Sequence, residues 1–90
     1  MIQKFRKKPV EIEATQFKVA ELKTMNEVVN FCNILGVEIF EPNEGRRVAF
    51  QIRTLEGVME VKDGDWVITG VAGEKYPCRN DIFERTYEKV

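Results

Sequence analysis

The stretch TMNEVVNFCNILG, residues 24–36, decides the fold class, because it carries the clearest helical pattern in the chain. Thr24 and Glu27 form the T-x-x-E pattern of a capping box, which marks the start of a helix. Apolar side chains at positions 28, 31, 32 and 35 follow the i, i+3, i+4, i+7 spacing of one buried stripe. Gly36 stands where a left-handed cap ends a helix. The sequence therefore predicts an amphipathic helix over about 24–35.

Most of the remaining chain alternates with a period of two, which is typical of strands with one buried face. In VEIEA, residues 10–14, apolar positions alternate with glutamates, and Pro9 precedes them where its missing N–H does least harm. Residues 37–40 are either a short strand or an apolar loop over the core. Gly57 predicts a β-hairpin, because glycine readily adopts the positive φ of a tight turn. We expect strands over about 10–17, 47–54, 58–62, 65–70 and 74–78.

The predicted order is a strand, the helix, a meander of about four strands, and a short helical C-terminal segment capped by Asn80 or Asp81. Turn signals about every 8–12 residues favour a small, curled antiparallel sheet with the helix packed on it. The prediction is an α+β fold. No linker or repeat divides the 90 residues, so we expect a single domain, 1–90.

Composition bounds the location and the partners of the protein. The chain is 43% hydrophobic and 32% charged, as in folded domains. It has no apolar run near the ~20 residues of a membrane span and no signal-peptide core, so we expect a cytoplasmic protein that does not bind membranes. The formal net charge of −1 provides no overall attraction to nucleic acid. Lys4, Arg6, Lys7 and Lys8 form a basic arm that could contact phosphates, although a solvated terminus is the favoured interpretation.

Residue types that are missing argue against common enzyme chemistries. The chain has no histidine and no serine, which excludes Ser-His and Cys-His nucleophilic catalysis. Two cysteines cannot supply the ligands of a zinc site, and a disulfide between Cys32 and Cys78 is not expected in a reducing cytoplasm. Cys32 lies on the apolar helix stripe and is interpreted as a small buried residue. Ordinary turn chemistry explains the acidic residues between positions 56 and 65. We expect no enzymatic activity, no metal and no cofactor.

The stretch GDWVITGVAGEKYPC, residues 64–78, holds the only tryptophan and brings aromatic and basic residues together. Trp66 is interpreted first as an anchor of the β core. The alternative is a stacking platform for a base, which requires an exposed ring and a nearby cation. Arg46 and Arg47 are candidate anion contacts beside Gly45, although a solvated loop is the favoured interpretation. The candidate ligand-binding residues are Arg53, Trp66, Lys75, Tyr76 and Arg79.

Three segments carry a resemblance to a known family: RKKPVEIEATQF, IRTLEG and GDWVITGVAGEKYPCRNDIFERTYEKV. Together they resemble a family of short uncharacterised proteins of tailed bacteriophages and prophages. The resemblance covers about half of the chain and is most specific from Gly64 to Tyr87. It implies a phage accessory protein in the host cytoplasm, and such proteins often bind a host protein, a nucleic acid or a signalling nucleotide. The family has no established activity, so no catalytic residue is carried over.

Two classes of function are therefore expected. The leading prediction is a non-enzymatic binding module for a nucleotide or a single-stranded nucleic acid, because base stacking on an aromatic ring contributes ~1–3 kcal/mol per base. The alternative is a homodimer, or another homo-oligomer, that inhibits or modulates a host protein through a sheet edge or helix face. A chain this small buries only somewhat more than ~60% of its unfolded surface, so a second copy could complete its core.

Overall fold

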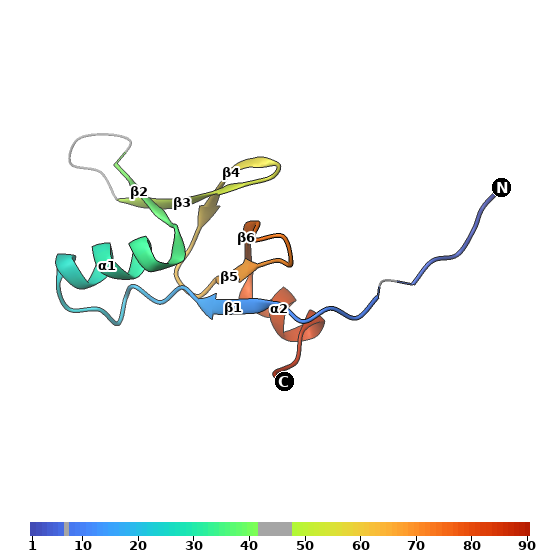
Figure 1. Ribbon diagram of the computed structural model, residues 1–90. Helices are drawn as coiled ribbons and strands as arrows, with labels where there is room; N and C mark the ends of the chain where they lie inside the picture. The colour runs from blue at the N-terminus through green and yellow to red at the C-terminus, as the bar shows by residue number, and fades with distance from the viewer. Residues whose placement is uncertain (7, 42–47) are drawn as a thin grey trace.

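The structure is a computed structural model that describes residues 1–6, 8–41 and 48–90. The fold is α+β, as predicted, with two helices and two small antiparallel sheets (Figure 1). The elements in chain order are β1 (Glu13–Gln16), α1 (Met25–Leu35), β2 (Glu38–Phe40), β3 (Ala49–Thr54), β4 (Gly57–Val61), β5 (Trp66–Thr69), β6 (Lys75–Cys78) and α2 (Asn80–Thr86). Among the described residues, neither helix is long and apolar enough to cross a membrane.

The strands divide between two sheets, where the sequence suggested one. Sheet A has the order β1-β5-β6 and sheet B has the order β2-β3-β4. The division occurs after β4, where Gly64 has a φ of 96° and the chain turns away from sheet B. The next strand, β5, then pairs with β1, at least 50 positions earlier in the chain, in the register Glu13↔Thr69 to Gln16↔Trp66. Residues 37–40, left open by the sequence, include the short strand β2.

Helix α1 has the predicted boundaries and caps. The hydroxyl of Thr24 accepts a hydrogen bond from the Glu27 N–H, and the Glu27 carboxylate accepts one from the Thr24 N–H. This reciprocal capping box satisfies backbone donors that have no partner within the helix. At the other end, Gly36 adopts the left-handed conformation with a φ of 76°. Cys32 and Leu35 of the predicted stripe are buried, which confirms the interpretation of Cys32 as a core residue.

The first strand is shorter than the predicted range 10–17. β1 begins at Glu13, because its partner β5 has four residues and ends opposite Glu13 at Thr69. Residues 10–12 therefore have no strand beside them within the described residues. The N-cap of the C-terminal helix also differs from the prediction of Asn80 or Asp81. The N-cap residue of α2 is Arg79, and its side chain makes no capping hydrogen bond. The side-chain oxygen of Asn80 instead accepts a hydrogen bond from the indole Nε1 of Trp66 at 2.9 Å.

The core lies between α1 and the two sheets, with Phe17 at its centre. Phe17 is fully buried, stacks on Phe31 with 5.8 Å between ring centroids, and meets the edge of Phe50 at 5.0 Å. The other buried members of this cluster are Cys32, Leu35, Val37, Ile52, Val61 and Val67. Ile68 is also fully buried but lies outside this cluster, because successive side chains of β5 point to opposite faces.

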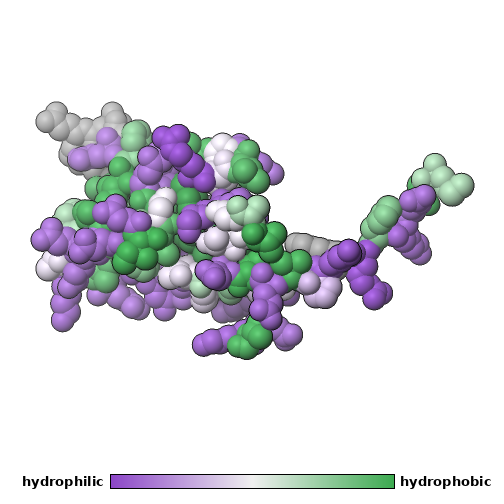
Figure 2. Space-filling model, in the orientation of Figure 1, coloured by the Kyte–Doolittle hydropathy of each residue, from purple (hydrophilic) through white to green (hydrophobic). Residues whose placement is uncertain are grey.

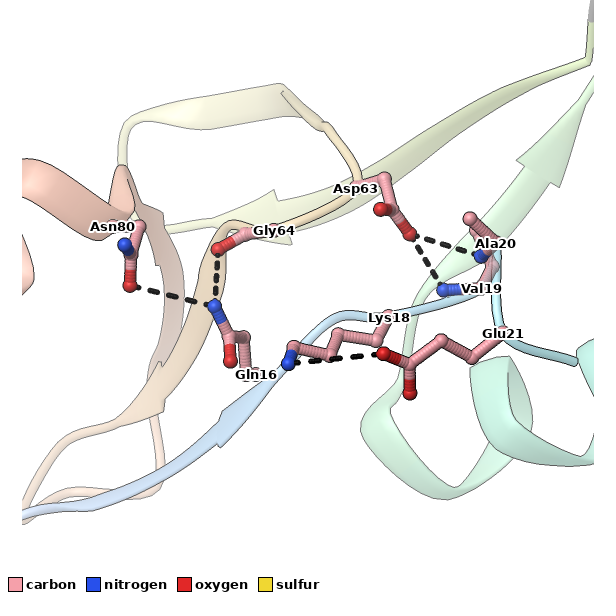
Figure 3. A network of polar contacts seen from close by, with 8 residues as sticks. All are labelled: Gln16, Lys18, Val19, Ala20, Glu21, Asp63, Gly64 and Asn80. Carbon is pink, nitrogen blue, oxygen red and sulfur yellow. Dashed lines mark hydrogen bonds and ion pairs between the residues drawn. The ribbon is translucent and has the colours of Figure 1, made fainter.

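A set of hydrogen bonds, which we call the junction clamp, joins the end of β1 and the residues after it, 16–20, to residues 63–65 between the sheets. The Phe17 N–H donates to the carbonyl of Asp65 and the Gly64 N–H donates to the carbonyl of Phe17, both at 2.7 Å. The Asp63 carboxylate accepts from the N–H groups of Val19 and Ala20 (Figure 3). The clamp thus ties the turn that leaves sheet B to the chain that leaves sheet A.

Candidate functional site

A groove of about 450 Å³ lies where the tips of the two β-hairpins approach the end of α1. It is lined by residues 52–55 from the end of β3 and the following turn, by residues 73–75 before and in β6, and by Gly36 and Glu38. We call it the tip groove. It brings together Arg53 and Lys75, two of the five candidate ligand-binding residues. The two residues come from separate strands, β3 and β6, and had been predicted to share one surface with the other three candidates.

Lys75 is the central cation of the tip groove. It is partly buried, and its ammonium donates a hydrogen bond to the hydroxyl of Thr69, its cross-strand partner, at 3.0 Å. Its aliphatic stem passes over Gly36, where an added Cβ would lie 3.5 Å from Cδ of Lys75. No ion pair between described residues includes Lys75. The ammonium is therefore held in place by neutral groups.

The other charged residues of the groove already have partners. The Arg53 guanidinium pairs with the Glu38 carboxylate at 3.0 Å, and both side chains are largely exposed. The carboxylate of Glu74 accepts a hydrogen bond from the Ala72 N–H at 3.0 Å, within its own hairpin turn. The exposed ion pair between Arg53 and Glu38 contributes little to stability, roughly 0–1 kcal/mol. An anionic ligand can therefore compete for Arg53 at small cost.

The aromatic candidates lie on the opposite face of sheet A, beneath α2. The Trp66 ring stacks on Phe83 with 4.2 Å between centroids and 8° between planes. Phe83 in turn packs against Tyr87, whose hydroxyl lies 3.5 Å from the hydroxyl of Tyr76. Trp66 and Tyr76 are partly buried, and Phe83 of α2 covers one face of the Trp66 ring. Trp66 thus packs on α2, and it lies outside the buried core cluster.

The contact with Tyr87 changes the acidity of Tyr76. The hydrogen bond to the Tyr87 hydroxyl, followed by partial burial, raises the pKa of Tyr76 to about 12. Nearby negative charge and the second tyrosine act in the same direction. Tyr76 therefore keeps its proton at neutral pH and acts as a neutral packing residue.

The candidate residues thus separate into two groups. Lys75 faces the tip groove, whereas its neighbour Tyr76 faces α2, because side chains alternate along a strand. Arg79 precedes α2 and pairs with Asp81 at 2.8 Å. The anion candidates Arg46 and Arg47 lie outside the described residues.

Most residues that contribute to the tip groove or its cation were not candidates from the sequence, among them Glu38, Thr69 and Glu74. The contact between Thr69 and Lys75 follows from the register of the β5–β6 hairpin, which the glycine turn between them could have indicated. The pairing of Glu38 with Arg53 depends on β2 lying beside β3. No local pattern indicates that arrangement.

The two cysteines are free, and neither has the environment of a reactive thiol. Burial raises the pKa of the Cys32 thiol. Burial, together with the negative charges of Asp65 and Asp81, also raises the pKa of the Cys78 thiol. Within the described parts of the chain, no three Cys, Asp or Glu side chains gather in a way that could hold a metal ion.

Comparison of the chain with protein-family models, with curated proteins and with solved structures found no match.

Proposed function

We propose that the chain is a binding module that holds a small phosphate-bearing molecule, a nucleotide in the first instance, in the tip groove. The observation that carries this proposal is the environment of Lys75. Its partly buried ammonium donates to Thr69 and has no carboxylate partner among the described residues. An ammonium has three donors, so two can turn to a ligand, and partial burial strengthens their attraction to a phosphate.

Arg53 supplies a second cation on the same groove. Its guanidinium can exchange the Glu38 carboxylate for two phosphate oxygens, because the planar fork of donors fits either group. Leu55, 87% exposed, lies on the same lining and offers apolar surface to the uncharged part of the ligand.

A single nucleotide fits this arrangement better than a nucleic-acid strand. Binding of a single strand uses successive aromatic platforms, each of which stacks one base. The ring of Trp66 already stacks on Phe83, and Tyr76 lies against Tyr87. A base could take the place of Phe83 on Trp66 only if α2 moved away from sheet A.

We propose binding and not catalysis, because the acidic residues of the groove are engaged in protein contacts. Glu38 accepts from Arg53, and Glu74 accepts from the Ala72 N–H. Neither carboxylate is oriented by a neighbouring base, as an acid–base pair would require.

The proposal can be tested with a panel of inorganic phosphate and of nucleoside mono-, di- and triphosphates, using calorimetry. The Lys75→Met variant keeps the stem that packs over Gly36 and removes the charge. Loss of its charge-assisted hydrogen bonds should weaken binding by roughly tenfold to a hundredfold. Lys89→Met, in the C-terminal tail, is the matched control and should bind normally. Equal affinities for the two variants, or no binding by any member of the panel, would refute the proposal.

A second proposal is that the chain associates with a protein surface, either a second copy or, if the phage relationship holds, a host protein. It is favoured by an apolar groove of about 220 Å³, lined by Val19, Ala20, Met25, Val28, Ile39, Val48 and Phe50. Met25, Ile39 and Val48 are 64%, 40% and 38% exposed although they line one surface. Gathered apolar side chains of this kind mark interaction surfaces more often than scattered ones do.

Sedimentation velocity over a wide range of protein concentration tests self-association. A sedimentation coefficient that rises with concentration supports it. A monomer at every concentration would refute the version in which the partner is a second copy.

A further inference from the structure

The N-terminal arm is the basic segment that we define as residues 1–8, of which the structure describes all but residue 7. Figure 1 shows it extending from β1 on the side away from α1. Ile2 and Phe5 are 97% and 88% exposed. No hydrogen bond or ion pair between described residues involves a residue before Glu13. The molecule has principal extents of 55 × 30 × 23 Å and a radius of gyration of 15.4 Å, against about 12 Å expected for a compact domain of this length.

The charge of the arm is opposite to that of the body. Residues 1–8 contain four basic and no acidic side chains, whereas residues 9–90 contain ten basic and fifteen acidic ones. The formal charges are therefore +4 and −5. Two arms repel each other, but an arm and the body of another copy attract each other. Figure 2 shows that the arm also presents hydrophobic residues between the hydrophilic ones.

The apolar groove has the chemistry to receive the hydrophobic residues of the arm. Phe50 lies on its lining and also packs on Phe17, so an aromatic ring that enters the groove would extend an existing aromatic cluster. The chain segments that line the groove also carry exposed carboxylates and ammoniums. Among them are Glu21, Glu27, Glu38, Glu41, Lys18 and Lys23.

The position of the arm favours a groove on a second copy over the groove of the same chain. The arm leaves β1 at Glu13, whereas the groove begins at Val19, beyond the other end of that strand. To reach its own groove, the arm would have to reverse its direction along β1. Eight extended residues span at most about 26–29 Å, enough to cross to a neighbouring molecule. A two-fold axis would make this exchange reciprocal, with two identical contacts.

We infer that the N-terminal arm of one copy binds the apolar groove of a second copy, with Phe5 as the inserted side chain and the basic residues against the acidic body. This inference rests on the proposed self-association and specifies which surfaces produce it. The contact combines apolar burial, which does not depend strongly on salt, with a screened electrostatic attraction.

Sedimentation velocity of the full chain and of five variants tests the inference. Deletion of residues 1–8 and the substitution Phe5→Glu remove the arm contact, and Met25→Glu places a charge in the groove. Gln3→Glu and Ile34→Glu are the matched controls, since both positions are exposed and Ile34 lies on α1 outside the groove. We expect Phe5→Glu and Met25→Glu to weaken the dimer by roughly tenfold to a hundredfold and Ile34→Glu to leave it nearly unchanged. Gln3→Glu, which lowers the arm charge by the same unit as Phe5→Glu but removes no apolar group, should weaken the dimer much less than Phe5→Glu does. Circular dichroism should show the same fold in all of them, because the described arm residues make no hydrogen bond or ion pair with the body and Met25 is largely exposed.

A mixing experiment distinguishes this specific contact between arm and groove from nonspecific association of the chains. The arm-deleted chain keeps an intact groove, and the Met25→Glu chain keeps an intact arm. Each alone should be a monomer, whereas the mixture should form a heterodimer through the one remaining arm and groove.

Three outcomes would contradict the inference, and each can be told from the others. A dimer that survives deletion of the arm would overturn the inference while leaving self-association in place. A full chain that stays monomeric would overturn both. A monomer that binds a single-stranded oligonucleotide, and loses that binding with the arm, would overturn the inference in favour of a nucleic-acid partner.

Discussion

The substitution Asp63→Ala tests whether the junction clamp holds the two sheets together. The Asp63 carboxylate accepts hydrogen bonds from the N–H groups of Val19 and Ala20, at 2.7 and 3.1 Å (Figure 3). Alanine leaves both donors without a protein acceptor, at the point where the chain passes from β1 toward α1. The neighbouring bonds between Phe17 and residues 64 and 65 are backbone bonds that alanine does not remove.

The expected loss follows from these two contacts. A hydrogen bond to a charged group contributes about 1.5–3 kcal/mol, but Asp63 is exposed, and water can replace it at both N–H groups. Because the two bonds share one oxygen, we expect a combined loss of about 2 kcal/mol. For a domain of this size, that loss lowers the melting temperature by about 8–16 °C. Asp63→Asn keeps an acceptor oxygen without its charge and should lose about half as much.

Urea unfolding followed by Trp66 fluorescence measures the free energy of unfolding of each variant. Glu56→Ala is the matched control, because it removes the same charge from an exposed turn position. We expect the control to remain within about 0.5 kcal/mol of the parent protein. If Asp63→Ala were no less stable than Glu56→Ala, the clamp would not be a determinant of stability and the reasoning would be wrong.

Three further predictions concern α1 and the packing of α2. Gly36→Ala should destabilise the protein by about 1–2 kcal/mol in urea unfolding, because a side chain resists the left-handed φ of 76°. Phe83→Ala should shift the emission of Trp66 to longer wavelength and speed amide exchange in α2, since it removes the aromatic stack. Tyr87→Phe should lower the pKa of Tyr76 from about 12 toward 10, measured by the absorbance of tyrosinate. Because the folded-state pKa is raised, the contact stabilises the parent protein fully below about pH 10, and this stabilisation should fall as the pH rises toward 12.

The elements that the sequence predicted well are those whose signals lie within a few residues. The capping box of Thr24 and Glu27, the glycine cap at position 36 and the turn glycine at position 57 all occur in the structure as expected. Each depends on contacts within one helical turn or one hairpin, so neighbouring residues are sufficient to specify it. The alternation along β6 also separates Lys75 from Tyr76, although both had been grouped in one candidate site.

The candidate site was predictable only in part, because its contacts join distant segments. Lys75 and Arg53 were candidates, but their meeting at the tip groove depends on how the two hairpins pack against each other. The stack of Phe83 on Trp66 depends on the direction in which α2 leaves β6. Neither arrangement follows from a pattern within a single element.

By itself, the sequence determined the α+β class, the helix with both of its caps, the hairpins and the absence of histidine and serine chemistry. Tertiary structure decided that β5 pairs with β1, which divides the strands into two sheets and makes the first strand begin at Glu13. The physical reason is the range of the forces involved. Caps and turns are satisfied by residues close in the chain. A strand instead pairs with the strand that best buries its apolar face, here the face of β5 that carries Val67, whatever the distance between the two strands in the sequence.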